Sequence, residues 1–179
     1  MGLILAGKTK KETESKRTFE CMGNQFVLVT ITMSAFSTNS SHLLPRPFHW
    51  RLADGKNPPL DISIDPESGL LREITFFIEG KIADQNAFLP SYKSDKGQPV
   101  FQIKRWGKNE YYLDEEGMID ITLYNNDIYC IFSGINIDNT LDINKKLICI
   151  FDNNNVLGGF ILKDLDKKEK RVFKDAGLI

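Results

Sequence analysis

Histidine is the side chain most often used for metal binding and for acid–base catalysis near neutral pH. This 179-residue chain has two histidines, His42 and His49. Neither has a cysteine, a second histidine or a carboxylate at the spacing that zinc sites use. His49 stands between Phe48 and Trp50, and this position is typical of a residue on the face of a strand. The histidines therefore predict no metal site.

The three cysteines are far apart, odd in number and surrounded by apolar residues: Cys21, Cys130 and Cys149. This usage is typical of buried, reduced thiols and not of disulfides or activated nucleophiles. The sequence also lacks the motifs of serine hydrolases, phosphate-binding loops and zinc peptidases. We therefore expect no catalytic residues and no cofactor, so the chain is not expected to be an enzyme.

Two acidic segments, 138–142 and 152–155, superficially resemble calcium-binding loops. A calcium loop needs a third oxygen ligand and a glycine at fixed positions, followed by a glutamate. In the second segment Val156 and Leu157 take the places of that ligand and glycine. These segments are therefore interpreted as acidic turns.

Composition places the chain among ordinary globular proteins, since 41% of the residues are hydrophobic and 26% are charged. The net charge of −1 gives no overall attraction to nucleic acid or to anionic lipid. No apolar run approaches the length that spans a bilayer, so we expect a cytoplasmic protein. Its length predicts one domain over 1–179, in which 1–17 is a flexible start or part of a first strand.

Strand patterns dominate the chain, and helical periodicity is scarce. β-branched and alternating segments cover 25–33, 48–52, 60–64, 73–78, 100–106, 110–113, 118–124, 128–132, 147–151 and 160–162. One C-terminal helix is predicted over 164–174, and a short second helix is possible around 84–89. The fold class expected is mainly β, or α+β, built as an antiparallel sandwich or a strongly bent sheet.

Four hairpins are predicted from the residues that separate these strands. The hairpins are 60–78, 100–113, 118–132 and 147–162, and their turns contain Pro, Gly, Asn or Asp. Gly158 and Gly159 in the last hairpin predict a bulge or a close approach of two backbones. Segments 62–76 and 148–162 also resemble each other, either because acidic hairpins look alike or because a half-domain was duplicated.

Carboxylates are concentrated in two windows in spite of the near-neutral total. Residues 61–80 hold five acids and one arginine, and residues 118–160 hold five acids and two lysines. If the two windows share a sheet, they form either a solvated acidic face or a docking surface for a basic partner. The candidate contacts are Asp61, Asp65, Glu67, Glu73, Asp127, Asp138, Asp142 and Asp152.

A second candidate contact surface mixes basic and aromatic side chains. Trp106 follows Lys104 and Arg105, and Tyr111 and Tyr112 stand on the expected return strand. Such a hairpin can stack on single-stranded nucleic acid. Trp, Tyr and Arg also dominate the energetics of protein interfaces, so a protein partner is the preferred interpretation.

Residues 59–76 resemble a stretch found in bacterial immunity proteins that neutralise polymorphic or contact-dependent toxins. Residues 127–133 and 146–162 resemble a small bacterial β-meander module. The resemblance implies a cytoplasmic binding protein without catalytic residues, which blocks a cognate toxin, often a basic nuclease. The alternative is a structural β module, or one that binds a carbohydrate or small ligand in a sheet cleft, and an enzyme of unfamiliar type is a third reading.

Overall fold

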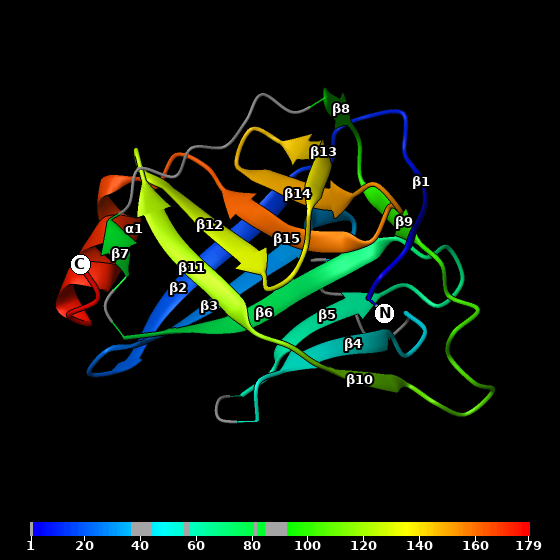
Figure 1. Ribbon diagram of the computed structural model, residues 1–179, viewed down its shortest axis with the longest axis horizontal. Coiled ribbons are helices and arrows are strands. Elements are labelled where there is room, and N and C mark those ends of the chain that lie inside the picture. The colour runs from blue at the N-terminus through cyan, green and yellow to red at the C-terminus, as the bar shows by residue number, and fades with distance from the viewer. Residues whose placement is uncertain (1, 37–43, 56–57, 81, 85–92) are drawn as a thin grey trace.

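Two β-sheets face each other, and an α-helix lies at one end (Figure 1). The computed structural model describes residues 2–36, 44–55, 58–80, 82–84 and 93–179. The first sheet has the strand order β10-β4-β5-β6-β3-β2. Its strands are β2 (Ser15–Gly23), β3 (Phe26–Met33), β4 (Phe48–Ala53), β5 (Leu60–Ile64), β6 (Leu71–Glu79) and β10 (Tyr112–Glu116). The predicted sandwich with a C-terminal helix is confirmed.

The second sheet has seven strands in the order β7-β11-β12-β15-β14-β13-β8. They are β7 (Ala83–Asp84), β8 (Lys93–Lys96), β11 (Ile119–Tyr124), β12 (Asp127–Phe132), β13 (Ile137–Asn144), β14 (Leu147–Asp152) and β15 (Leu157–Leu162). Most neighbours are antiparallel, but β10 with β4, β7 with β11 and β8 with β13 are parallel. These three parallel pairs all lie at sheet edges.

Two short strands, β1 (Leu5–Lys8) and β9 (Pro99–Phe101), form an antiparallel pair. This pair lies beside the β5–β6 turn of the first sheet and the β14–β15 turn of the second. Single bridges join Ile4 to Val156 beside β15 and Leu70 beside β6 to Val100. The first 17 residues therefore contain β1 and the start of β2. Of the two predictions for this segment, a flexible start or part of a first strand, the structure shows the strand.

The core lies between the sheets because alternate residues of each strand point inward. In β3 the buried positions are Val27, Val29, Ile31 and Met33, and polar or half-buried residues separate them. Aromatic rings meet across the interface: Phe76 contacts Phe160 edge-on with centroids 5.1 Å apart. This alternation is the pattern by which the sequence predicted half-buried strands.

The C-terminal helix α1 (Lys167–Asp175) is shorter than the predicted 164–174 at its start. Asp166 caps it by accepting hydrogen bonds from the backbone of Lys168 and Glu169, and Glu169 completes a capping box. Its Phe173 packs edge-on against Phe19 of β2 at 5.1 Å. In the described part of the chain, no helix is long and apolar enough to cross a membrane.

Three of the four predicted hairpins are confirmed. The β11–β12 turn has positive φ at Asn125 (49°) and Asn126 (75°), as a tight hairpin turn requires. The 60–78 hairpin is β5–β6, and the 147–162 hairpin is β14–β15. These last two lie in opposite sheets, so the acidic windows do not share a sheet.

The predicted hairpin over 100–113 is wrong. Its first half is only β9, which pairs with β1, and residues 102–111 form turns and irregular backbone. Its second half becomes β10, which pairs in parallel with β4. Trp106 explains the difference, because it is buried under β4 against Phe48 and cannot belong to an exposed strand.

Several polar strands were missed because they carry little apolar alternation. β2 and β13 are edge-proximal and polar, and β8 lies in the stretch 90–99 that was expected to be irregular. A short helix was expected around 84–89, but its first residue, Asp84, is the last residue of strand β7. Residues 85–89 lie outside the described residues, as does His42.

The predicted bulge at the paired glycines is confirmed, and it generates a stability test. The register between β14 and β15 shifts at Gly158, and Gly159 has φ 143°. A Cβ at Gly159 would lie 2.1 Å from the Cys130 carbonyl oxygen.

We expect Gly159→Ala to lower the free energy of unfolding by about 2–4 kcal/mol, measured by denaturant titration. Gly7→Ala is the control, because its Cβ would meet nothing within 4 Å, and a comparable loss there would contradict this reading.

Candidate functional site

Aromatic and charged side chains gather on the outer face of the first sheet, over β4, β5 and β10. We name this surface the arginine–tyrosine patch, and it comprises Arg46, His49, Arg51, Asp61, Tyr111, Tyr112 and Asp114. Alternation in β4 turns Trp50 and Leu52 into the core, so His49 and Arg51 face outward. The parallel register of β10 then places Tyr112 opposite His49 and Asp114 opposite Arg51.

Tyr112 is the centre of the patch, and 47% of its surface is exposed. The His49 ring stacks on it with centroids 4.9 Å apart and planes inclined by 21°. The Arg51 guanidinium lies 4.6 Å from the Tyr112 ring centroid, and the Arg46 guanidinium lies 4.1 Å from that of Tyr111. These are cation–π distances, so the rings and the cations hold one another in place.

One ion pair and one histidine–carboxylate contact position polar side chains of the patch. Arg51 donates from Nε to Asp114 Oδ1 at 2.6 Å and from its terminal nitrogen to Oδ2 at 2.8 Å. These hydrogen bonds raise the pKa of Arg51 and lower the pKa of Asp114. His49 Nδ1 lies 2.8 Å from Asp61 Oδ1. The side chains are therefore held in one arrangement before any partner arrives.

Of the three aromatic residues predicted as contacts, only Tyr112 is largely accessible. Tyr111 is half-buried, and Trp106 is only 7% exposed. The Trp106 ring stacks on Phe48 at 5.2 Å, and its Nε1 donates to the His49 carbonyl oxygen at 3.3 Å. Trp106 is thus a support beneath the patch and not a contact on its surface.

Sequence reasoning missed Arg46 and Arg51 and placed His49 correctly on a strand face without giving it a role. The missed signal was the alternation of His49 and Arg51 with buried Trp50 in β4. Nothing local to the sequence places β10 beside β4, and without that pairing the patch cannot be recognised.

Two of the eight predicted acidic contacts are interior residues. Asp65 is 7% exposed and forms an ion pair with Arg72, and it also accepts hydrogen bonds from the Ser68 backbone and hydroxyl. Burial alone would raise the pKa of Asp65, but the bonds from Arg72 and Ser68 outweigh it and lower that pKa. Asp127 is 5% exposed and pairs with Lys163 at 2.7 Å.

The other six acids are distributed over both sheets and do not form one surface. Asp61 belongs to the patch, and Glu73 on the same face accepts from the Thr32 hydroxyl at 2.7 Å. Asp152 accepts from the backbone of Asn154 and Val156 in its own turn. Glu67 and Asp138 are exposed and Asp142 is half-buried.

The cysteine prediction holds for two of the three thiols. Cys130 and Cys149 are buried, and burial raises the pKa of Cys149 to about 12, so neither thiol is an activated nucleophile. Cys21 is exposed on β2, which corrects the expectation that it is buried. Within the described ranges, no group of three or more His, Cys, Asp or Glu side chains could hold a metal ion.

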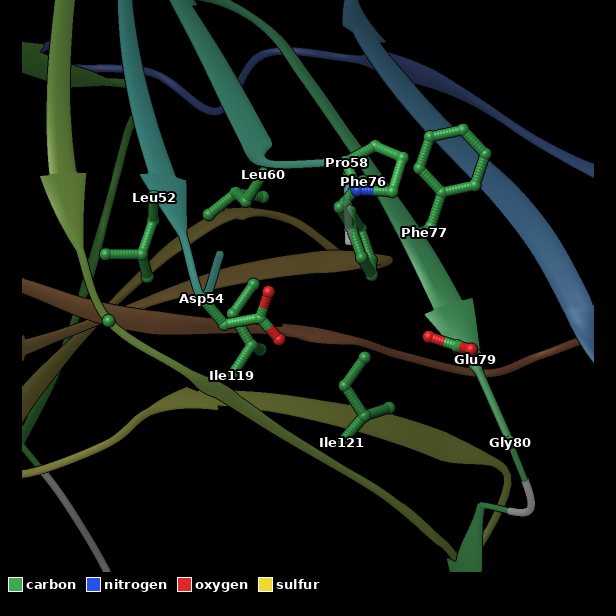
Figure 2. Close-up of a pocket in the computed structure, with 11 residues that line it drawn as sticks. Leu52, Asp54, Pro58, Leu60, Phe76, Phe77, Glu79, Gly80, Ile119 and Ile121 are labelled. Carbon is green, nitrogen blue, oxygen red and sulfur yellow. The ribbon is translucent and has the colours of Figure 1, made fainter. Parts of the chain in front are cut away.

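A cleft of about 390 Å³ opens at one end of the sandwich, on the inner side of the strands that carry the patch (Figure 2). Leu52, Leu60 and Phe76 come from the first sheet, and Ile119 and Ile121 come from β11 of the second. The carboxylates of Asp54 and Glu79 lie at its edge. The described residues therefore form two candidate binding surfaces, a charged aromatic patch and a cleft between the sheets.

The Asp65–Arg72 pair predicts a stability effect that separates Asp65 from its exposed neighbour. Asp65→Ala leaves the Arg72 charge buried and unpaired, and we expect a loss of about 3 kcal/mol in the free energy of unfolding. Glu67→Ala in the same turn is the control and should change stability by less than about 0.5 kcal/mol. Equal effects of the two substitutions in denaturant titrations would show that Asp65 is not an interior anchor.

The same pair predicts a pH dependence. The pKa of Asp65 is lower in the folded chain than in the unfolded chain. Its ionised form therefore stabilises the fold above the unfolded pKa, and this contribution is lost as the pH falls through the folded pKa. The difference in stability between the natural chain and Asp65→Ala should accordingly shrink below about pH 4, as measured by denaturant titration across a pH series.

Comparison with known proteins assigns no family to the chain. No protein-family model matches the chain, and no curated protein matches it either. The functional argument therefore depends on the patch, the cleft and the residues that hold them.

Proposed function

We propose that this chain is a non-enzymatic binding protein that docks on a protein partner through the arginine–tyrosine patch. The observation that carries the proposal is the exposed Tyr112 ring, on which His49 stacks and over which Arg51 lies while it pairs with Asp114. Tyrosine and arginine are the side chains that most often dominate interface energetics. A fixed arrangement lowers the entropic cost of binding, because few rotamers are lost.

The partner we propose is a cognate bacterial toxin, which this chain neutralises as an immunity protein. The resemblance of residues 59–76 to such proteins supports this, and this segment forms the β5–β6 hairpin that contributes Asp61 to the patch. The mechanism is steric occlusion of the toxin, with steering by charge. A basic partner such as a nuclease is what the resemblance implies, and the exposed Glu116 beside the patch offers a carboxylate for steering by charge. Binding in the cytoplasm would protect the cell that makes the toxin.

The cleft between the sheets favours a second candidate function, a β module that binds a small ligand. Its volume of about 390 Å³ falls in the range of ligand sites, and Leu60, Phe76 and Ile121 are among the residues that line it. This candidate uses a different surface, so the two functions make different predictions for the same variants.

Co-expression with the product of the neighbouring gene, as the candidate toxin, tests the proposal. The natural chain should form a complex with the toxin and restore growth of cells that express it. Tyr112→Ala should weaken the complex at least about tenfold, because truncating a central interface tyrosine removes both its apolar contact and its cation–π partners. Binding is measured by calorimetry on the purified proteins.

Met118→Ala is the matched control, because Met118 is 60% exposed and lies outside the patch. It should bind the toxin as the natural chain does. An unchanged affinity in Tyr112→Ala would reject the patch as the docking surface. Failure of the natural chain both to bind the toxin and to protect the cells would reject the immunity function.

A further inference from the structure

Lysine and arginine side chains gather at the end of the molecule where helix α1 lies (Figure 1). Phe173 and the C-cap residue Ala176 are buried on one side of the helix, so the opposite side faces solvent. Four cations recur on that side at helical spacing: Lys167, Lys170, Arg171 and Lys174. We name this surface the basic end, and its full membership is Lys145, Lys146, Lys167, Lys168, Lys170, Arg171 and Lys174.

Arg17 of β2 joins the helix to the turn between β13 and β14, which carries Lys145 and Lys146. Its guanidinium donates to both carboxylate oxygens of Glu169 at 2.7 Å. It also donates to the backbone carbonyl oxygens of Lys146 at 3.2 Å and Lys163 at 2.7 Å. The Arg17 side chain is only 5% exposed, so it serves the fold and not the surface. The fold therefore holds the two groups of cations next to each other.

The acids close to the helix are directed mostly into the fold. Segment 163–175 contains six cations and four acids. Asp166 caps the helix by accepting hydrogen bonds from the backbone of its first turn. Glu169 pairs with Arg17, and Asp164 is exposed just before the helix. The outward side of the helix is therefore left basic.

Five of the seven cations at the basic end have neither an ion pair nor an ammonium hydrogen bond in the described part of the chain. Lys170 donates to the Asn126 side chain, and Arg171 lies 3.6 Å from Asp175. The other five are Lys145, Lys146, Lys167, Lys168 and Lys174. The residues outside the described ranges contain no Asp or Glu, so all 24 acidic residues are among those described. The chain itself therefore supplies no partner carboxylate to these lysines.

Several of these cations oppose the stability of their own helix. Lys167 and Lys168 occupy the first turn, where the helix dipole favours acids over bases. Lys167 and Arg171 stand four residues apart, and so do Lys170 and Lys174, and like charges at this spacing destabilise a helix. An anion bound over this side of the helix would relieve both effects. The pattern therefore favours an anionic partner over a purely structural role.

We propose that the basic end binds the phosphate backbone of double-stranded nucleic acid. Lysine and arginine are the side chains that most often bind these phosphates, and a duplex carries one negative charge per about 1.7 Å of its axis. The helix face from Lys167 to Lys174 is about 10 Å long, so several of its cations meet a phosphate at once. Because the net charge of the chain is −1, the attraction is local to this surface.

Other anionic macromolecules fit the basic end less well. The one aromatic residue of α1, Phe173, is buried, so the helix offers no ring on which unpaired bases could stack. The apolar side of the helix is packed against Phe19 of β2, so it is not available to enter a membrane. The surface is also separate from the arginine–tyrosine patch over β4, β5 and β10 (Figure 1). Duplex binding therefore does not depend on the toxin proposal.

Fluorescence anisotropy on the full chain with a labelled DNA duplex of about 20 base pairs tests the proposal. The chain should bind two duplexes of unrelated sequence with affinities within about twofold, because backbone contacts carry no sequence information. Raising the salt concentration from about 50 to about 200 mM should weaken binding at least about tenfold, because each phosphate contact releases counterions. No binding at about 100 μM chain in low salt, or an affinity that salt does not change, would overturn the proposal.

Two other anions are compared with the duplex at equal concentration of negative charge. Vesicles of phosphatidylcholine with about 30% phosphatidylserine represent a membrane, and poly-glutamate represents an acidic protein. Both should bind more weakly than the duplex. Tighter binding of the chain to either of them would reject nucleic acid as the partner.

Charge-removing variants locate the surface. Lys167→Gln/Lys174→Gln and Lys145→Gln/Lys146→Gln should each weaken duplex binding at least about threefold in low salt and reduce its salt dependence, because each removes two phosphate contacts. Glutamine has a helix propensity close to that of lysine, so the helix variant should unfold at the same denaturant concentration or a higher one. Unchanged duplex binding in both variants would overturn the proposal.

Lys104→Gln/Lys108→Gln is the matched control. These two exposed lysines lie in the connection from β9 to β10, on the opposite side of the molecule from α1 (Figure 1). The control removes the same charge and should bind the duplex as the natural chain does. An equal loss in the control would show that the duplex follows total charge and not the basic end.

Discussion

The parallel pairing of β10 with β4 is the constraint on which both candidate binding surfaces, the patch and the cleft, depend. It places Tyr112 beside His49 and Asp114 beside Arg51, which creates the patch. It also brings the chain to Gly117, where it must cross to the second sheet and thereby forms one wall of the cleft. Contacts beneath the strand hold this pairing: Trp106 stacks on Phe48, and Arg105 pairs with Glu115 at 2.7 Å.

Local signals in the sequence predicted the parts of the fold whose partners are close along the chain. The Asn125–Asn126 turn and the Asp65–Gly69 turn join neighbouring strands, so residue type alone defined those hairpins. The pairing of Tyr112 with His49 joins residues that are distant in sequence, and no turn encodes it. Polar edge strands such as β8 also escaped prediction, because all four of its residues are exposed and no apolar alternation marks it.

The acidic residues show that composition predicts how many charges the chain carries, but not which of them are buried in ion pairs and which are exposed. Asp65 and Glu67 stand two residues apart in the same turn, and the sequence gives them equal weight as contacts. Only the position of Arg72 on the return strand distinguishes them, because it draws Asp65 into a buried ion pair and leaves Glu67 in solvent. A buried carboxylate requires a partner charge and hydrogen bonds, so the buried acids of this chain are held by interactions within the fold. Only the exposed acids are accessible to a partner.

The two faces of β4 link stability to binding. Trp50 and Leu52 point into the core, and His49 and Arg51 point outward to the patch, so a single strand serves both. A strand held by core packing on one side presents its outer side chains at fixed positions. Such side chains lose little conformational entropy when a partner binds. Because the Leu52 side chain also lines the cleft, the core, the patch and the cleft all depend on the same few residues of one strand. The regularity of β4 and its pairing with β10 are therefore conditions for the proposed recognition as well as for folding.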